Sequence, residues 1–176
     1  MKIKSTKFKD LKVVFSKVHK DPRGSFREVF KKKFFKSKNF VFTCVSTSKK
    51  NVLRGMHLQT RNGQGKYLTV LKGEILDVCI DLRKNSKTFG KHFAINISER
   101  NGISVYIPPG FAHGFLGLKN ENIISYHCTN YRSKKHEIGI NWNDRDIKIK
   151  WPIKRPMLSK KDKKNISFKD YLKKYA

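Results

Sequence analysis

In the stretch Tyr67-Leu68-Thr69-Val70-Leu71-Lys72-Gly73-Glu74-Ile75-Leu76-Asp77-Val78-Cys79-Ile80-Asp81-Leu82, a lysine–glycine turn separates two aliphatic runs. Both runs are of strand length and rich in β-branched residues, so the stretch predicts two strands joined by a tight turn. Outward from it, four more segments show alternation or β-branched and aromatic enrichment, at 40–46, 92–97, 103–107 and 123–128. Turn signals such as Asn101-Gly102 and Pro108-Pro109-Gly110 lie between them.

Many short strands at regular spacing favour an all-β sandwich or barrel of the jelly-roll kind. Helices are expected only near 29–35 and near 168–175. A chain of 176 residues fits one domain, and neither an internal repeat nor a linker divides it, so we expect a single domain over 1–176.

The charge balance is strongly positive, with 41 Lys and Arg against 13 Asp and Glu, a net +28. Such a charge is compatible with a nucleic-acid-binding β-barrel, which stays open as a rival hypothesis. Most of the cations are lysines scattered along the whole chain, and no nucleic-acid-binding motif accompanies them. We therefore favour a solvated basic surface that attracts an anionic small substrate, with neither nucleic acid nor a membrane as partner.

The cellular compartment is indicated by two further features. No apolar run approaches the roughly 18 residues of a membrane span, and the basic start of the chain is not followed by the apolar segment of a signal peptide. Cys44, Cys79 and Cys128 each sit in a strand-like run without a CxxC pairing. We expect three reduced, buried thiols in a cytoplasmic protein.

Two glycine-marked runs each carry one histidine. Leu53-Arg54-Gly55-Met56-His57-Leu58-Gln59 and Pro108-Pro109-Gly110-Phe111-Ala112-His113-Gly114-Phe115 both read as a short strand next to a tight turn. The later segment 158–162 adds a carboxylate, Asp162, that is suited to orient one imidazole. Histidines, a lysine and a carboxylate without metal-ligand spacing suggest proton transfer on carbon rather than metal-assisted hydrolysis.

Seven stretches in order along the chain resemble the dTDP-4-dehydrorhamnose 3,5-epimerase family, or relatives of it that act on another nucleotide-linked 4-keto sugar. These stretches are 21–28, 52–59, 64–66, 81–90, 107–115, 139–144 and 158–162. The resemblance implies a cupin-type β-jelly roll that forms a homodimer and donates an N-terminal strand across the interface. Leu58 and Gln59 stand where a cupin metal site would need a second ligand, so we expect no metal and no cofactor.

The resemblance also implies a set of catalytic residues. His57 is the expected base that removes a proton next to the 4-keto group, and Asp162 is its orienting carboxylate. Lys66 is expected near the developing enolate oxygen, and Tyr126 as the proton donor on the opposite face of the sugar. The implied activity is epimerisation at C3, C5 or both, in dTDP-rhamnose and surface-polysaccharide (lipopolysaccharide) biosynthesis.

A second implied set binds the nucleotide diphosphate sugar. Arg23 and Arg54 match phosphate-contacting arginines, since guanidinium groups suit phosphate oxygens. Phe26 matches an aromatic residue that stacks on the base, with Glu28 in the same loop, while His113 is expected to hold the substrate or the enolate. The remaining expected substrate-binding residues are Ser46, Gln59 and Arg132.

The chain departs from the family pattern around the nucleotide. Phe42 and Cys44 replace a glutamine and an asparagine on the strand before Arg54, and Arg132 replaces the second of two adjacent tyrosines. A pocket that loses hydrogen-bonding groups changes its selectivity, so these substitutions predict that dTDP is not the best ligand. A sugar-nucleotide 3,4-ketoisomerase and a non-catalytic sugar-nucleotide-binding cupin stay open as alternatives.

Overall fold

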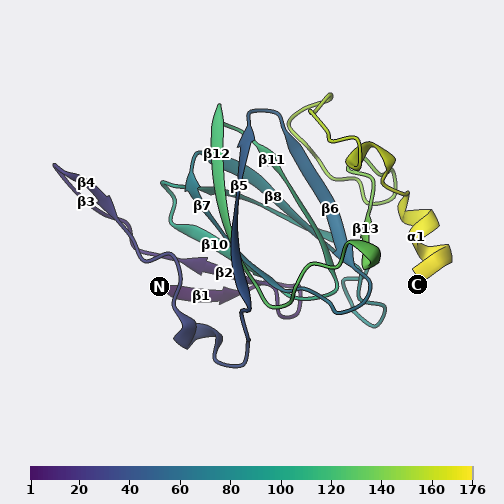
Figure 1. Ribbon diagram of the computed structural model, residues 1–176, viewed down its shortest axis with the longest axis horizontal. Coiled ribbons are helices and arrows are strands. Elements are labelled where there is room, and N and C mark those ends of the chain that lie inside the picture. Colours follow the sequence, from purple (N-terminus) through teal and green to yellow (C-terminus); the bar gives the residue numbers. More distant parts are fainter. Residues whose placement is uncertain (176) are drawn as a thin grey trace.

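Two antiparallel sheets face each other in the computed structural model, which describes residues 1–175 (Figure 1). The six-stranded sheet has the order β1 (Lys2–Ser5), β2 (Lys12–Phe15), β10 (Ile103–Ile107), β7 (Lys66–Lys72), β12 (Glu121–Cys128) and β5 (Phe42–Lys49). The five-stranded sheet has the order β13 (Glu137–Gly139), β6 (Leu53–Gln59), β11 (Phe111–Gly117), β8 (Glu74–Asp81) and β9 (His92–Ser98). The all-β jelly-roll prediction is confirmed.

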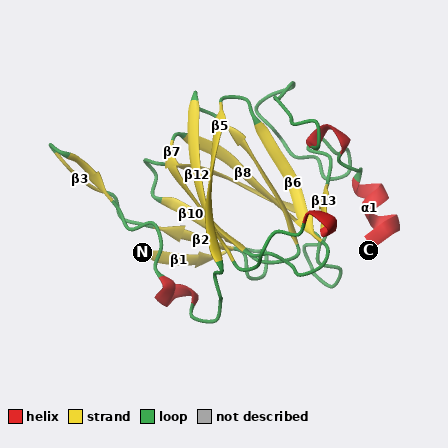
Figure 2. Cartoon of the chain, viewed as in Figure 1, coloured by secondary structure: helices red, strands yellow, loops and turns green. Residues whose placement is uncertain are grey.

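A separate two-stranded hairpin, β3 (His19–Asp21) and β4 (Gly24–Phe26), extends away from the two sheets (Figure 1). Helical structure is sparse (Figure 2). It consists of three short 3-10 turns, η1 (Lys32–Phe35), η2 (Lys134–His136) and η3 (Asp162–Lys164), and the helix α1 (Phe168–Tyr175). None of the helices in the described part of the chain is long and apolar enough to cross a membrane.

The predicted strands and the helix at 168–175 are confirmed. Missed were β1 to β4 and β13, which have only three or four residues each, too few for a period of two to stand out. The helix predicted near 29–35 is wrong, because only the 3-10 turn η1 forms there. Lysines occupy its start, no acidic residue lies in its first turn and no side chain caps it, so the N-terminal end of an α-helix would be unfavourable.

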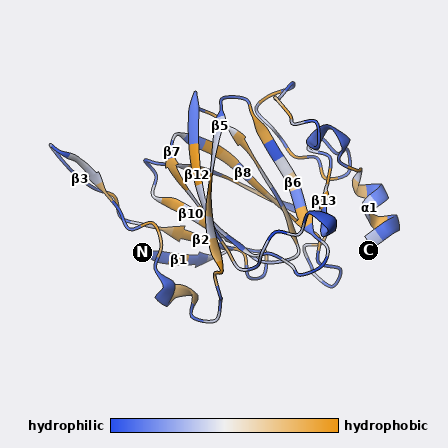
Figure 3. Ribbon diagram, in the orientation of Figure 1, coloured by the Kyte–Doolittle hydropathy of each residue, from blue (hydrophilic) through white to orange (hydrophobic). Residues whose placement is uncertain are grey.

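The main core lies between the two sheets, where strands from both contribute aliphatic and aromatic side chains; the hydrophobic stretches of the strands are orange in Figure 3. The strand β8 is buried on both faces, because its other face is covered by the C-terminal segment and Tyr171 of α1. The outer face of the six-stranded sheet is covered by a cluster around Phe35 of η1. These layers bury the outer faces of both sheets.

The strands β6 and β11 approach each other unusually closely. Gly55 has a φ of +128°, and a Cβ atom there would lie 2.4 Å from the Cα of Gly114. The pairing of β6 and β11 shifts register at this contact, and His57 lies directly opposite His113. The two glycines therefore allow the approach that sets both predicted histidines side by side.

The prediction of three buried thiols is correct for Cys79 and Cys128 and wrong for Cys44, which is exposed. Cys44 lies on β5, which is an edge strand paired only with β12. Its side of β5 faces the open end of the sandwich, so no opposing layer covers it.

Candidate active site

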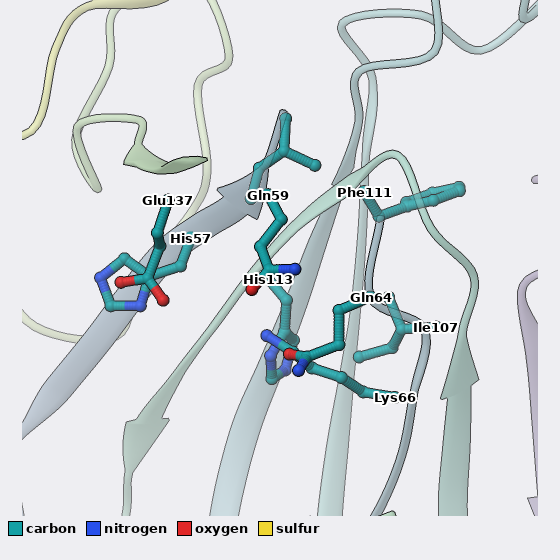
Figure 4. A pocket seen from close by; sticks show the side chains of 9 residues that line it. His57, Gln59, Gln64, Lys66, Ile107, Phe111, His113 and Glu137 are labelled. Atoms are coloured by element: carbon teal, nitrogen blue, oxygen red, sulfur yellow. The ribbon is translucent and has the colours of Figure 1, made fainter. Parts of the chain in front are cut away.

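A cavity of about 800 Å³ opens between the two sheets at the end where β5, β6 and β12 lie. This volume is within the range of small-molecule binding pockets, about 300–1,000 Å³. Eight of the predicted site residues line it, namely Ser46, Arg54, His57, Lys66, His113, Tyr126, Arg132 and Asp162. A narrow recess beside the cavity shares His57, Gln64, Lys66, His113 and Glu137 with it and adds Gln59 (Figure 4).

His57 and Asp162 form the central pair. His57 Nε2 lies 2.6 Å from Asp162 Oδ1, and Asp162 is 5% exposed. Burial by itself raises the pKa of the Asp162 carboxyl, but the hydrogen bond and charge of His57, the hydrogen bond with Ser159 and the charge of Lys161 together hold the pKa below its usual value. Asp162 is therefore ionised at neutral pH, which fixes the proton of His57 on Nε2 and leaves Nδ1 as the basic nitrogen.

The tail segment that carries Asp162 is anchored to the sheet by Asn165. The Asn165 Nδ2 group donates to the carbonyl oxygen of Gly55 at 2.8 Å. The absence of a side chain at Gly139 makes room for this amide, because a Cβ atom there would lie 2.1 Å from Asn165 Oδ1. The Asp162 amide also donates to Ser159 Oγ at 3.0 Å. These contacts place the carboxylate against a histidine that lies 105 positions away in the sequence.

His113 has a carboxylate partner of its own, Asp77, which the sequence analysis assigned only to a core strand. His113 Nε2 lies 2.6 Å from Asp77 Oδ1, and Asp77 is completely buried. The Asp77 side chain points inward because side chains alternate with a period of two along β8. Nothing in the sequence pairs Asp77 with a histidine 36 positions later. The site therefore holds two neighbouring histidines, each with its own carboxylate.

Tyr126 and Lys66 belong to the sheet opposite His57. Tyr126 OH lies 3.1 Å from Ser46 Oγ, and burial raises the pKa of the Tyr126 phenol well above its usual value. Lys66 opens β7 and is partly buried, and this burial lowers the pKa of its ammonium group. The Tyr126 phenol and the Lys66 ammonium group thus lie across the cavity from His57 and His113.

Glu137 is a charged residue of the site that the sequence analysis missed. Arg132 holds it in a two-pronged ion pair, with Nε 2.8 Å from Oε2 and Nη2 3.0 Å from Oε1, and Lys161 also contacts it. Burial by itself raises the pKa of the Glu137 carboxyl, but these two cations lower it to about 2. Arg132 therefore forms an ion pair with Glu137 and also lines the cavity.

Arg54 and Gln59 are held by neighbouring strands and loops. Arg54 donates from Nε to Ser48 Oγ at 2.9 Å and from Nη2 to the Thr47 carbonyl at 3.0 Å. Gln59 accepts from the Ser133 amide at 2.7 Å and donates to the Asn62 carbonyl at 2.9 Å. Gln59 lines the narrow recess rather than the main cavity.

Three predicted residues lie outside both the cavity and the recess of their own chain. Arg23 and Phe26 lie on the exposed hairpin, where Phe26 is 68% exposed and Arg23 pairs with Asp21 at 2.7 Å. Glu28 follows the hairpin and pairs with Lys31. Within one chain the structure does not bring these residues to His57.

Metal ligands are not clustered in the described part of the chain. Among residues 1–175, no three His, Cys, Asp or Glu side chains gather closely enough to hold a metal ion. The carboxylates Asp162 and Asp77 are each engaged by one histidine, an arrangement that can orient both imidazole rings.

Comparison with known proteins identifies the family. The family model for dTDP-4-dehydrorhamnose 3,5-epimerase matches residues 5–170. The chain belongs to this epimerase family. It is 41% identical to the dTDP-4-dehydrorhamnose 3,5-epimerase of Shigella flexneri, with 97% of each protein covered. As a member it is an isomerase of the racemase and epimerase class.

Solved structures of other members of this epimerase family share the fold. An epimerase from Legionella pneumophila, in complex with dTDP-4-keto-L-rhamnose, superposes with a TM-score of 0.89 at 37% identity, covering 94% of this chain and 92% of that one. A 3'-monoepimerase from Streptomyces bikiniensis, in complex with dTDP-quinovose, superposes with a TM-score of 0.90 at 26% identity, covering 96% and 88%. The prediction of a cupin-type jelly roll is confirmed.

Proposed function

We propose that this protein epimerises C3 and C5 of a nucleotide-linked 4-keto-6-deoxy sugar through an enolate intermediate. The observation that carries the proposal is the His57–Asp162 pair, with 2.6 Å between Nε2 and Oδ1, at the wall of a cavity of about 800 Å³. A keto group acidifies the hydrogens on both neighbouring carbons, and a base that titrates near neutral pH is suited to remove them.

In this mechanism Nδ1 of His57 accepts the proton from the substrate carbon. The imidazolium that forms is stabilised by the Asp162 carboxylate, which already accepts from Nε2. The negative charge that develops on the 4-keto oxygen is stabilised by the ammonium group of Lys66 and by His113, whose ring is fixed by Asp77.

Tyr126 supplies the proton that inverts the configuration. It stands on the sheet opposite His57, so it protonates the enolate carbon from the other face of the sugar. Its raised pKa keeps the phenol protonated at neutral pH, as a proton donor must be. The resulting phenolate recovers its proton from water, and His57 releases its proton to water, so one turnover leaves both groups unchanged.

Replacing the base tests the mechanism most directly. We predict that His57→Ala abolishes exchange of the C3 and C5 hydrogens with solvent deuterium while the fold is retained, as judged by circular dichroism and thermal unfolding. The matched control is His92→Gln, because His92 lies outside the cavity and bonds to the Ile147 carbonyl at 3.1 Å. Exchange retained at both carbons in His57→Ala would remove His57 from the role of base.

The nucleotide is tested by a binding panel. Relatives of this chain are named for dTDP sugars, whereas Phe42, Cys44 and Arg132 predict that another base binds better. Calorimetric titration of dTDP, UDP, CDP and GDP at one ionic strength separates the two expectations, since a chain of net charge +28 attracts every diphosphate. A tenfold or larger preference for dTDP would contradict the prediction from the substitutions.

We further infer a homodimer in which the hairpin of one chain completes the cavity of the other. The exposure of Phe26 and Arg23 supports this, because an aromatic ring that is 68% exposed on an extended hairpin has no contact partner in its own chain that buries it. Arg23 and Arg54 would then both contribute guanidinium groups for the diphosphate.

A further inference from the structure

Two thiols share the wall of the substrate cavity, and the proposed chemistry uses neither. Cys44 lies on β5 and Cys128 on the neighbouring strand β12, and both line the cavity. Cys44 is exposed, whereas Cys128 is 3% exposed. The reaction of a keto-sugar epimerase needs no thiol, so this pair calls for a separate explanation.

The register places the two side chains on the same face of the sheet as diagonal neighbours. Cys44 is directly opposite Tyr126, and Cys128 is directly opposite Phe42. Phe42 lies two residues before Cys44 on β5, and Cys128 lies two residues after Tyr126 on β12, so the two cysteines are diagonal to each other. Because side chains alternate with a period of two, Phe42, Cys44, Tyr126 and Cys128 all point into the cavity. Cys44 contributes to raising the pKa of the Cys128 thiol, and both thiols act against the lowering of the pKa of the Lys66 ammonium group.

We propose that Cys44 and Cys128 form a redox-responsive dithiol that distorts the cavity wall and lowers activity when it is oxidised to a disulfide. This inference rests on the proposed function only in taking the cavity as the substrate site. The oxidant class is a small disulfide. The Cys44 thiolate attacks one of its sulfurs and releases one thiol, and the Cys128 sulfur then attacks the Cys44 sulfur and releases the second. Two protein thiols and one disulfide thus become one protein disulfide and two small thiols.

The order of attack follows from the surroundings of each sulfur. Burial raises the pKa of the Cys128 thiol to about 12, although the nearby Lys66 ammonium group opposes this. Cys44 is in contact with solvent and therefore reacts first, while Lys66 favours the Cys128 thiolate in the second step. Cys79 is the natural internal control, because it is completely buried and its Sγ lies 3.7 Å from Asp77 Oδ2.

Disulfide formation would move β5 relative to Tyr126. Diagonal neighbours in an antiparallel pair have Cα atoms roughly 7–8 Å apart. A disulfide requires at most about 6.8 Å, so bond closure draws β5 toward β12 by about 1 Å. The strand can shift because β12 is its only neighbour in the sheet. The shift disturbs the contact of 3.1 Å between Ser46 Oγ and Tyr126 OH, and the strained bond is readily reduced again.

The test treats the full-length protein with oxidised glutathione and follows both bond formation and activity. We expect peptide mapping to find a Cys44–Cys128 bond with Cys79 still free, and epimerase activity to fall at least tenfold and return with dithiothreitol. A bound nucleoside diphosphate should slow bond formation several-fold. After the same treatment, Cys44→Asn and Cys44→Ser should each keep most of the activity that the same variant has before treatment.

The mass readout does not depend on the enzyme's substrate, so failure of the proposed function leaves the bond measurable. The inference is overturned if no bond forms between the two residues, if glutathione stays attached to Cys44 without transfer to Cys128, or if the bond forms and activity is unchanged. It is equally overturned if both Cys44 variants are inactivated as fast as the unaltered protein.

Discussion

Asp162 keeps a negative charge in a nearly buried position because His57 and the tail around it compensate the loss of water. This matters for catalysis, since an imidazole that is to accept a proton must be held in one tautomer and stabilised once charged. Asp77 likewise orients the ring of His113, with 2.6 Å between Asp77 Oδ1 and His113 Nε2. At the scale of single residues, the site is two histidines whose orientations depend on two carboxylates.

Asp162→Asn tests this dependence. The amide keeps the size of the side chain but removes the charge, and it can hold the imidazole in the wrong tautomer. We expect the turnover number to fall by roughly two to four orders of magnitude, with a much smaller change in KM. Steady-state kinetics measure the effect, and Asp146→Asn, an exposed aspartate of the same chain, is the matched control. An unchanged turnover number would place the tail outside the mechanism.

At the scale of elements, the cavity depends on how strands and loops are anchored around it. The strand β8 ends at Asp81, whose completely buried carboxylate binds Arg83 Nη2 at 2.8 Å, Ser86 Oγ at 2.6 Å and Thr88 Oγ1 at 2.7 Å. The family stretch at 81–90 is therefore a structural anchor for the loop between β8 and β9, and β8 in turn carries Asp77.

The pH dependence of stability follows from Asp81. Burial by itself raises the pKa of its carboxyl, but the hydrogen bonds from Arg83, Ser86 and Thr88 lower it from 3.8 to about 2. A pKa that is lower in the folded state stabilises the protein above pH 3.8, and this stabilisation is lost as the pH falls toward 2. We expect Asp81→Asn to lower the free energy of unfolding at pH 7 by on the order of 2 kcal/mol. Urea unfolding between pH 7 and 3 should show the difference shrinking on acidification, and a constant difference would contradict the assignment.

At the scale of the whole molecule, the hairpin and the cavity are separate within one chain. We expect a double variant, Arg23→Ala with Phe26→Ala, to be inactive because its hairpins cannot complete a partner's cavity, and His57→Ala to be inactive because it lacks the base. In a heterodimer of the two, one cavity has His57 and receives an intact hairpin. Mixing equal amounts, with exchange of subunits, should restore about a quarter of the normal activity. No recovery, or light scattering at 20.6 kDa, would contradict the shared site.

The strands β6, β7, β8, β11 and β12 could be read from the sequence because each has enough residues for its pattern to show. The same patterns located His57, His113, Lys66 and Tyr126 on strands that the structure brings together around one cavity. Glu137 was missed because β13 has only three residues. Asp77 was missed as a partner of His113 because a lone aspartate in an apolar run gives no sign of what it faces.

The sequence by itself determined that this protein is all-β and to which family it belongs, and it predicted the residues proposed to carry the chemistry. Local pattern suffices for the all-β fold class, because the alternation of side chains and the turn residues act over a few positions. The family and the candidate site residues follow instead from the resemblance of seven stretches along the chain. The tertiary structure confirmed the contact between His57 and Asp162 that the resemblance implied. Only the tertiary structure showed that Asp77 meets His113, that Cys44 shares an open cavity wall with Cys128, and that the hairpin lies away from the cavity of its own chain. Each of these depends on which strands face one another and on where the tail and hairpin run, and that is set by packing between segments far apart in the chain.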